Sequence, residues 1–71
     1  MKKTYFKTHI AFLRYLFDLS LQNDVTITLG TVTCAGGETN GAHVYRRGVI
    51  FEKVILDEAE YDNASNFDKG E

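Results

Sequence analysis

The chain has 71 residues, one cysteine, two histidines, no proline and a formal net charge of −2. This length allows one small core and no second domain, and such a core supplies only about 3 to 5 kcal/mol of stability unless a crosslink, a metal or self-association adds to it. One cysteine excludes an internal disulfide, and two histidines with one thiol cannot complete a closed zinc site, so we expect no metal and no cofactor.

The N-terminal segment is predicted to be an amphipathic helix. Residues 4–22 contain neither glycine nor proline, and apolar residues recur at helical spacing. The main stripe is Phe6, Ile10, Leu13, Phe17 and Leu21. A second set, Tyr5, Phe12, Leu16 and Leu19, widens the apolar side to roughly 200°. One small sheet cannot cover so wide an arc, so we predict that the second set forms an apolar interface with a partner or in a homodimer.

Three strands are predicted after the helix, at about residues 25–34, 42–46 and 49–56. The apolar positions of the first strand change parity after Gly30, which indicates a β-bulge there. Residues 36–41 are rich in turn formers and are interpreted as a hairpin loop, and Arg47-Gly48 as a tight turn. Residues 49–56 have the densest β propensity, which favours a central, buried strand.

These elements predict a single α+β domain in which an N-terminal helix packs on a three-stranded antiparallel sheet, in the order α-β-β-β. Residues 57–71 form an acidic C-terminal segment, in which residues 58–64 are suited to a short helix. We expect the last few residues to fray.

The two parts of the chain carry opposite net charges. Residues 1–53 carry seven basic and four acidic residues, a net charge of +3, whereas residues 54–71 carry one basic and six acidic residues, a net charge of −5. An acidic end is often only a solvating tail. The alternative is a docking face for a basic partner surface, formed by Asp57, Glu58, Glu60 and Asp62.

Residues with catalytic chemistry are sparse. Cys34 could be activated by His43 across the hairpin loop, but an unpaired cysteine is more often a small packing residue. His9 lies on the flank of the helix with no second ligand one turn away, so an edge or interface position is favoured over a metal site. We therefore expect no enzyme and no catalytic residue.

Binding of a macromolecular partner is the favoured function. We hypothesise a non-enzymatic interaction protein that inhibits or regulates a larger protein complex through its acidic face. Its size and charge are analogous to those of phage or mobile-element anti-defence, anti-CRISPR-like proteins, which present carboxylates in place of a nucleic acid. We expect no secretory signal and no membrane span, and the lone cysteine favours a cytoplasmic location.

The alternative is a small nucleic-acid-binding regulator. Its contacts would be the basic residues on the helix side of the chain and at the second hairpin turn, namely Lys3, Lys7, Arg14, Arg46 and Arg47.

Overall fold

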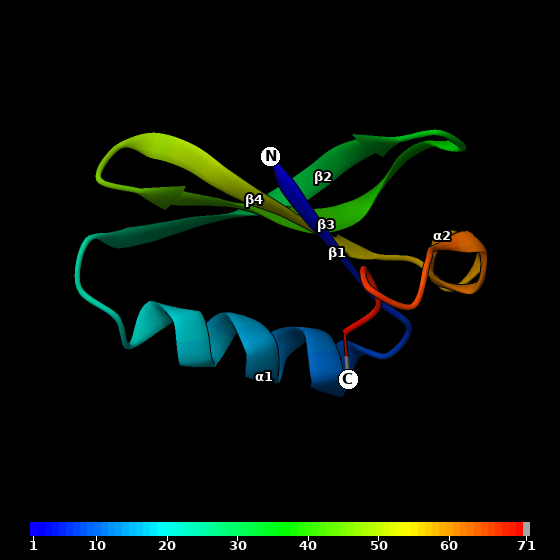
Figure 1. The fold of residues 1–71 in the computed structure, drawn as a ribbon, viewed down its shortest axis with the longest axis horizontal. Helices are drawn as coiled ribbons and strands as arrows, with labels where there is room; N and C mark the ends of the chain where they lie inside the picture. The colour runs from blue at the N-terminus through cyan, green and yellow to red at the C-terminus, as the bar shows by residue number, and fades with distance from the viewer. Residues whose placement is uncertain (71) are drawn as a thin grey trace.

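The computed structural model describes residues 1–70, which form an α+β fold with a four-stranded mixed sheet and two helices (Figure 1). The elements are β1 (Lys2–Phe6), α1 (His9–Ser20), β2 (Val25–Cys34), β3 (Gly37–Arg46), β4 (Val49–Leu56) and α2 (Glu58–Asn63). The strand order is β1-β4-β3-β2, in which β1 runs parallel to β4 and the other two pairs are antiparallel. The central position of residues 49–56 is thereby confirmed.

The first element is a strand, so the predicted helix over residues 4–22 is confirmed only for the part that forms α1. The predicted three-stranded antiparallel sheet was wrong in strand count and in element order. Thr4 pairs with Val54 and Phe6 with Leu56 in the parallel ladder between β1 and β4. The helix begins only after Thr8, whose side chain accepts a hydrogen bond from the Ala11 N–H at 3.3 Å. This contact is an N-cap, and it separates the β-forming Thr-Tyr-Phe run from the helical segment.

The two hairpins follow from local turn chemistry. The predicted bounds of β2 and β4 are confirmed, whereas β3 begins at Gly37, within the predicted loop. The first turn is therefore short, since Cys34 pairs directly with Gly37. At the second turn, Arg47 and Gly48 have φ values of 55° and 79°, and positive φ at both central residues is typical of the type I′ turn, which matches strand twist.

The β-bulge lies between β3 and β4 and not at Gly30. Pairing between β2 and β3 is continuous from the pair of Val25 with Arg46 to the pair of Cys34 with Gly37. Between β3 and β4, Val44 pairs with Glu52 and Tyr45 with Ile50, so Phe51 is the extra residue. The change of parity in β2 has another cause. Val25 and Ile27 pack on the α1 side of the sheet, whereas Val32 is buried on the other side, so the strand contributes apolar residues to both faces.

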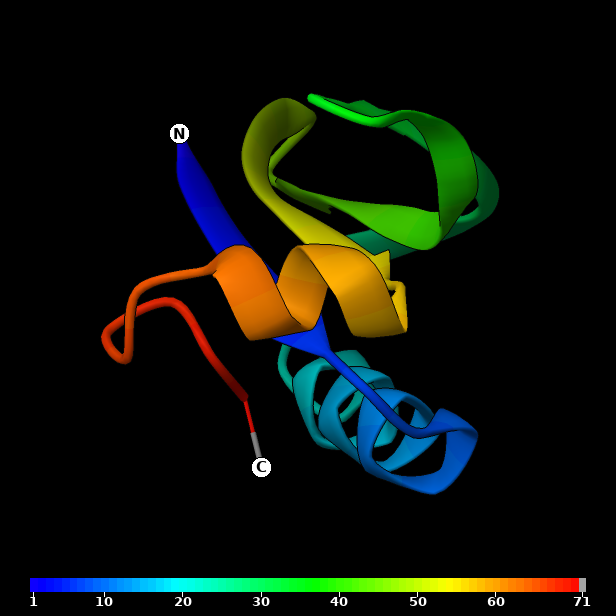
Figure 2. The ribbon, with the colours of Figure 1, turned by 90° about the vertical axis from the view of Figure 1, so that its right-hand side faces the viewer.

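The main core lies between α1 and one face of the sheet (Figures 1 and 2). The Phe6 ring packs against Phe12 and Tyr15, with centroid distances of 6.4 Å and 5.0 Å. The buried members of this cluster are Phe6, Phe12, Leu16, Leu19, Ala42, Val44, Val54 and Leu56. Phe12, Leu16 and Leu19 form the inner face of α1.

The C-terminal segment is tied to the free edge of β1. The Tyr5 N–H donates to the Asp68 carbonyl at 2.8 Å, and the Gly70 N–H donates to the Tyr5 carbonyl at 2.7 Å. These bonds form a short parallel bridge between Tyr5 and Lys69. The predicted fraying is therefore not observed up to Gly70, and the last residue of that prediction, Glu71, lies outside the described residues. The bridge also blunts an otherwise open sheet edge. None of the helices in residues 1–70 has the length and apolar character needed to cross a bilayer.

Candidate interaction surfaces

The side of α1 that points away from the sheet is apolar. Ile10, Leu13, Phe17 and Leu21 retain 71, 50, 63 and 68% of their accessible surface, and we call these four residues the outer face of α1. They lie about 140° around the helix from the inner face. Single exposed apolar residues are ordinary, but four on one helix stripe form a contiguous patch of the kind that marks a binding surface.

The predicted apolar interface was assigned to the wrong side of the helix. Phe12, Leu16 and Leu19 are buried in the core, and Tyr5 lies partly buried in β1, on the sheet face away from α1. Conversely, the stripe predicted to face the core is exposed except for Phe6. Both stripes have helical spacing, so periodicity alone could not decide which one packs on the sheet.

A polar contact inside the core distinguishes the two sides of α1. Tyr15 projects from the inner side, and its hydroxyl donates to Oε2 of the fully buried Glu52. Thr4 donates to the same oxygen at 2.6 Å. Burial, followed by the hydrogen bond to Glu52, raises the pKa of Tyr15 to about 12. A buried carboxylate needs such donors, and only the observed rotation of α1 brings Tyr15 to it.

A shallow groove of about 350 Å³ continues the apolar surface from α1 onto the edge strand β2. His9 and Leu13 line its helix side, and the exposed Leu29 lines its strand side. His9 is the first residue of α1 and is exposed there, in agreement with the predicted edge position. The outer face of α1 is therefore continuous with apolar surface on the sheet edge.

Two of the four predicted acidic contacts hold α2 in place. Asp57 is the N-cap of α2, accepting from the Glu60 N–H at 3.0 Å and from the Thr39 hydroxyl at 2.9 Å. These hydrogen bonds, the first of them above all, lower the pKa of Asp57. Glu60 accepts from the Gly36 N–H at 2.9 Å and so links α2 to the first hairpin turn. Glu58 and Asp62 project into solvent and are the members of the set that stay available to a partner.

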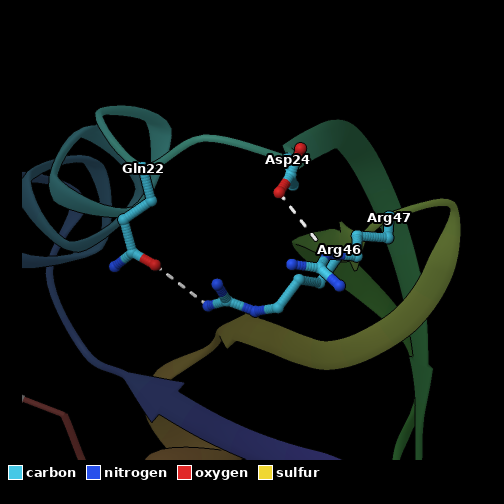
Figure 3. A network of polar contacts seen from close by, with 4 residues as sticks. All are labelled: Gln22, Asp24, Arg46 and Arg47. Carbon is cyan, nitrogen blue, oxygen red and sulfur yellow. Dashed lines mark hydrogen bonds and ion pairs between the residues drawn. The ribbon is translucent and has the colours of Figure 1, made fainter.

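The two arginines at the second hairpin turn are each held by a residue from the α1–β2 connection (Figure 3). Arg46 donates to the Gln22 side-chain oxygen at 3.0 Å, and its guanidinium lies 4.8 Å from the centroid of the Phe51 ring. Arg47 forms an exposed ion pair with Asp24 at 3.4 Å. Both arginines and Phe51 line an open hollow of about 450 Å³.

The other predicted basic contacts lie elsewhere on the molecule. Lys3 pairs with Lys53 in the β1–β4 ladder and points to the sheet face away from α1. Lys7 precedes α1, where its ammonium lies 5.9 Å from the centroid of the Tyr61 ring. Arg14 lies on the side of α1, beside a groove of about 520 Å³ that Lys2 and Lys69 also line. The basic residues therefore do not form one continuous stripe.

The alternative interpretation, in which His43 activates Cys34, is not supported by the geometry. Cys34 pairs with Gly37 at one end of the hairpin, whereas His43 pairs with Thr28, six residues along β2. Six residues of strand span about 20 Å, too far for proton transfer. Burial, together with the nearby Glu60 carboxylate, raises the pKa of the Cys34 thiol, which disfavours the reactive thiolate. Residues 1–70 contain no cluster of side chains suited to holding a metal ion.

Comparison with known proteins gives no relative. No family model matches the chain, and neither a curated protein nor a solved structure is significantly similar to it.

Proposed function

We propose that this chain acts by binding other protein chains and that the outer face of α1 is its principal contact surface. The observation that carries the proposal is the exposure of Ile10, Leu13, Phe17 and Leu21 on one side of a helix whose opposite side is already buried in the core. Apolar anchors at this helical spacing are typical of helices that pack into a groove or against another helix.

The energetics support this proposal. A fully buried Leu, Ile or Phe side chain is worth roughly 1.5 to 3 kcal/mol relative to its exposed state. The four residues of the outer face are at least half exposed, so covering them would release part of this free energy at each position. Four such side chains are exposed on a chain of only 71 residues. A second molecule that covers them would explain this exposure.

We further propose that the chain inhibits or regulates a larger complex, with Glu58 and Asp62 as acidic contacts to basic residues of that complex. The support is that these two carboxylates project into solvent on α2, which lies at one end of the sheet and not over the outer face of α1 (Figure 1). In this role the chain would resemble anti-defence proteins that present carboxylates in place of a nucleic acid. Exposed charges of this kind act mainly on association rate and specificity.

The outer-face proposal is tested with two glutamate variants. Phe17→Glu places a charge in the centre of the outer face, and Val49→Glu is the matched control because Val49 is also exposed, at 66%, but lies at the second hairpin turn. Both variants are expected to remain folded by circular dichroism. The amount of protein that binds to the immobilised chain is expected to fall roughly tenfold or more for Phe17→Glu and to stay unchanged for Val49→Glu. The bound protein includes further copies of the chain. Equal binding by the two variants would refute the proposal.

The second candidate is nucleic-acid binding at the second hairpin turn. It is favoured by Arg46 stacked on Phe51 beside the exposed Arg47, since an aromatic ring with adjacent guanidinium groups can hold a base and a phosphate. A mobility-shift assay across a salt series tests it. Binding that weakens steeply with salt and is lost in Arg47→Gln would support this candidate, whereas no shift at about 50 mM salt would exclude it.

A further inference from the structure

We infer that the partner of the outer face of α1 is a second copy of the same chain, and that the two helices pack antiparallel about a two-fold axis level with Leu16. This inference rests on the proposed function, because it names the occupant of that surface. Two properties of the helix carry it: the spacing of its exposed apolar residues and the position of its exposed charges.

The apolar residues of two such helices interleave. A two-fold axis at the level of residue 16 brings Phe17 of the second copy level with residue 15, between Leu13 and Phe17 of the first. Leu21 of the second copy comes level with residue 11, and Leu13 of the second copy with residue 19. Each of these side chains therefore meets a gap in the opposite stripe, which is how packed helices fill space without clashes.

The same arrangement pairs opposite charges. Arg14 and Asp18 lie on one flank of the outer face, about 40° apart around the helix. Within residues 1–70, neither of them forms an ion pair. In the antiparallel arrangement Arg14 lies level with Asp18 of the second copy, and the symmetry forms this contact twice. The charges of the flank are therefore self-complementary, as a two-fold interface requires.

A parallel pair of helices would lack this match. A two-fold axis along the helices would bring the flank of Arg14 and Asp18 against the opposite flank, which carries His9 and Ser20. That flank has no carboxylate for Arg14 and no fixed positive charge for Asp18. Electrostatics therefore favour the antiparallel orientation, while the apolar stripe supplies most of the free energy.

The dimer is expected to be weak. A helix of 12 residues is about 18 Å long, and a helix pair of this length covers less than the roughly 800 Å² per partner of a standard interface. Leu29 and the shallow groove beside Leu13 extend the contact only modestly. We therefore expect a dissociation constant on the order of micromolar, with monomer and dimer both populated at working concentrations.

The test is sedimentation equilibrium of the full chain and four variants: Phe17→Glu, Arg14→Asp, Asp18→Arg and the charge-swapped double variant of the last two. The wild-type chain is expected to be dimeric at about 100 µM, and Phe17→Glu monomeric. Each single charge reversal should weaken the dimer about tenfold by setting like charges against each other twice, and the double variant should restore it. The differences should shrink at high salt.

The outcomes separate this inference from the proposed function. A monomeric wild-type chain at about 100 µM overturns the dimer, and the outer face then remains a surface for a different protein, which the binding comparison of Phe17→Glu with Val49→Glu decides. A dimer that Phe17→Glu leaves intact overturns the location of the interface. A double variant as weak as the single reversals overturns the antiparallel arrangement.

Discussion

The Tyr15 hydroxyl donates a hydrogen bond of 2.5 Å to Oε2 of Glu52, a carboxylate with no exposed surface on the inner side of β4. Thr4 donates to the same oxygen, so one carboxylate connects α1, β1 and β4. This contact accompanies the rotation of α1 that buries Phe12, Leu16 and Leu19 and leaves the outer face exposed.

Loss of the Tyr15 hydroxyl is expected to destabilise the fold. Tyr15→Phe leaves the buried carboxylate with Thr4 as its remaining donor, and a hydrogen bond to a charged group contributes about 1.5 to 3 kcal/mol. Urea unfolding measures the change. Tyr5→Phe is the control, since the Tyr5 hydroxyl forms no hydrogen bond within residues 1–70 and its removal should cost under about 0.5 kcal/mol. Equal effects of the two substitutions would contradict the assigned role.

The contribution of Tyr15 is expected to disappear in alkali. Its pKa is about 12 in the folded chain, against 10.0 for an ordinary tyrosine, so the unfolded chain releases this proton first as pH rises. The stabilisation is therefore complete below pH 10.0 and is lost as pH rises towards about 12. Urea unfolding of wild type and Tyr15→Phe across this window should show their stability difference shrinking. A difference that is independent of pH would contradict the raised pKa.

Two glycines that face each other across β2 and β3 should differ in tolerance to alanine. Gly30 pairs with Gly41. A Cβ at Gly41 would clash with the Val54 carbonyl oxygen and would lie 2.7 Å from a Val32 methyl group, whereas a Cβ at Gly30 meets nothing within 4 Å. Gly41→Ala should therefore cost about 1 to 3 kcal/mol or more through overpacking, and Gly30→Ala should be neutral or slightly stabilising. Thermal unfolding of both variants is the measurement.

The acidic residues of α2 are expected to divide into two pairs. Asp57→Asn with Glu60→Gln weakens the contacts that hold α2, and faster amide hydrogen exchange in residues 58–63 should report this loss. In the wild-type chain the contribution of Asp57 should be complete above pH 3.8 and should be lost as pH falls below that value, because the pKa of Asp57 is lowered in the fold.

The second pair tests acidic docking separately. Glu58→Gln with Asp62→Asn should leave exchange in α2 unchanged and should slow association with a basic partner, most strongly at low salt. Unchanged association would leave the acidic segment as a solvating tail.

The sequence predicted the elements whose local signals agree with one another. The bounds of β2 and β4, the Arg47-Gly48 turn and the short helix near residues 58–64 follow from alternation, turn residues and an acidic first turn. Strand β1 was missed because its apolar residues continue the spacing of α1, and Thr8 was the one local sign of a helix start. The pairing of β1 with β4 is non-local, and nothing in the five residues of β1 indicates it.

The site was harder to predict than the fold. Two apolar stripes on one helix are equivalent in periodicity, and the stripe that packs on the sheet lies on the side of α1 from which Tyr15 reaches Glu52. The only sequence sign of that contact was a lone carboxylate within the strongly apolar run of residues 49–56. Likewise, the structural roles of Asp57 and Glu60 depend on Thr39 and Gly36, which lie far away in the sequence.

The most direct test of the central claim is site-specific photo-crosslinking in cells that produce the protein. A photoreactive side chain at position 17 lies in the outer face, and one at position 28 lies at an exposed site on β2. The account predicts a discrete protein adduct from position 17, with a second copy of the chain or with another protein, and none from position 28. The absence of any protein adduct from position 17, or equal crosslinking from both positions, would contradict the proposed role of the outer face.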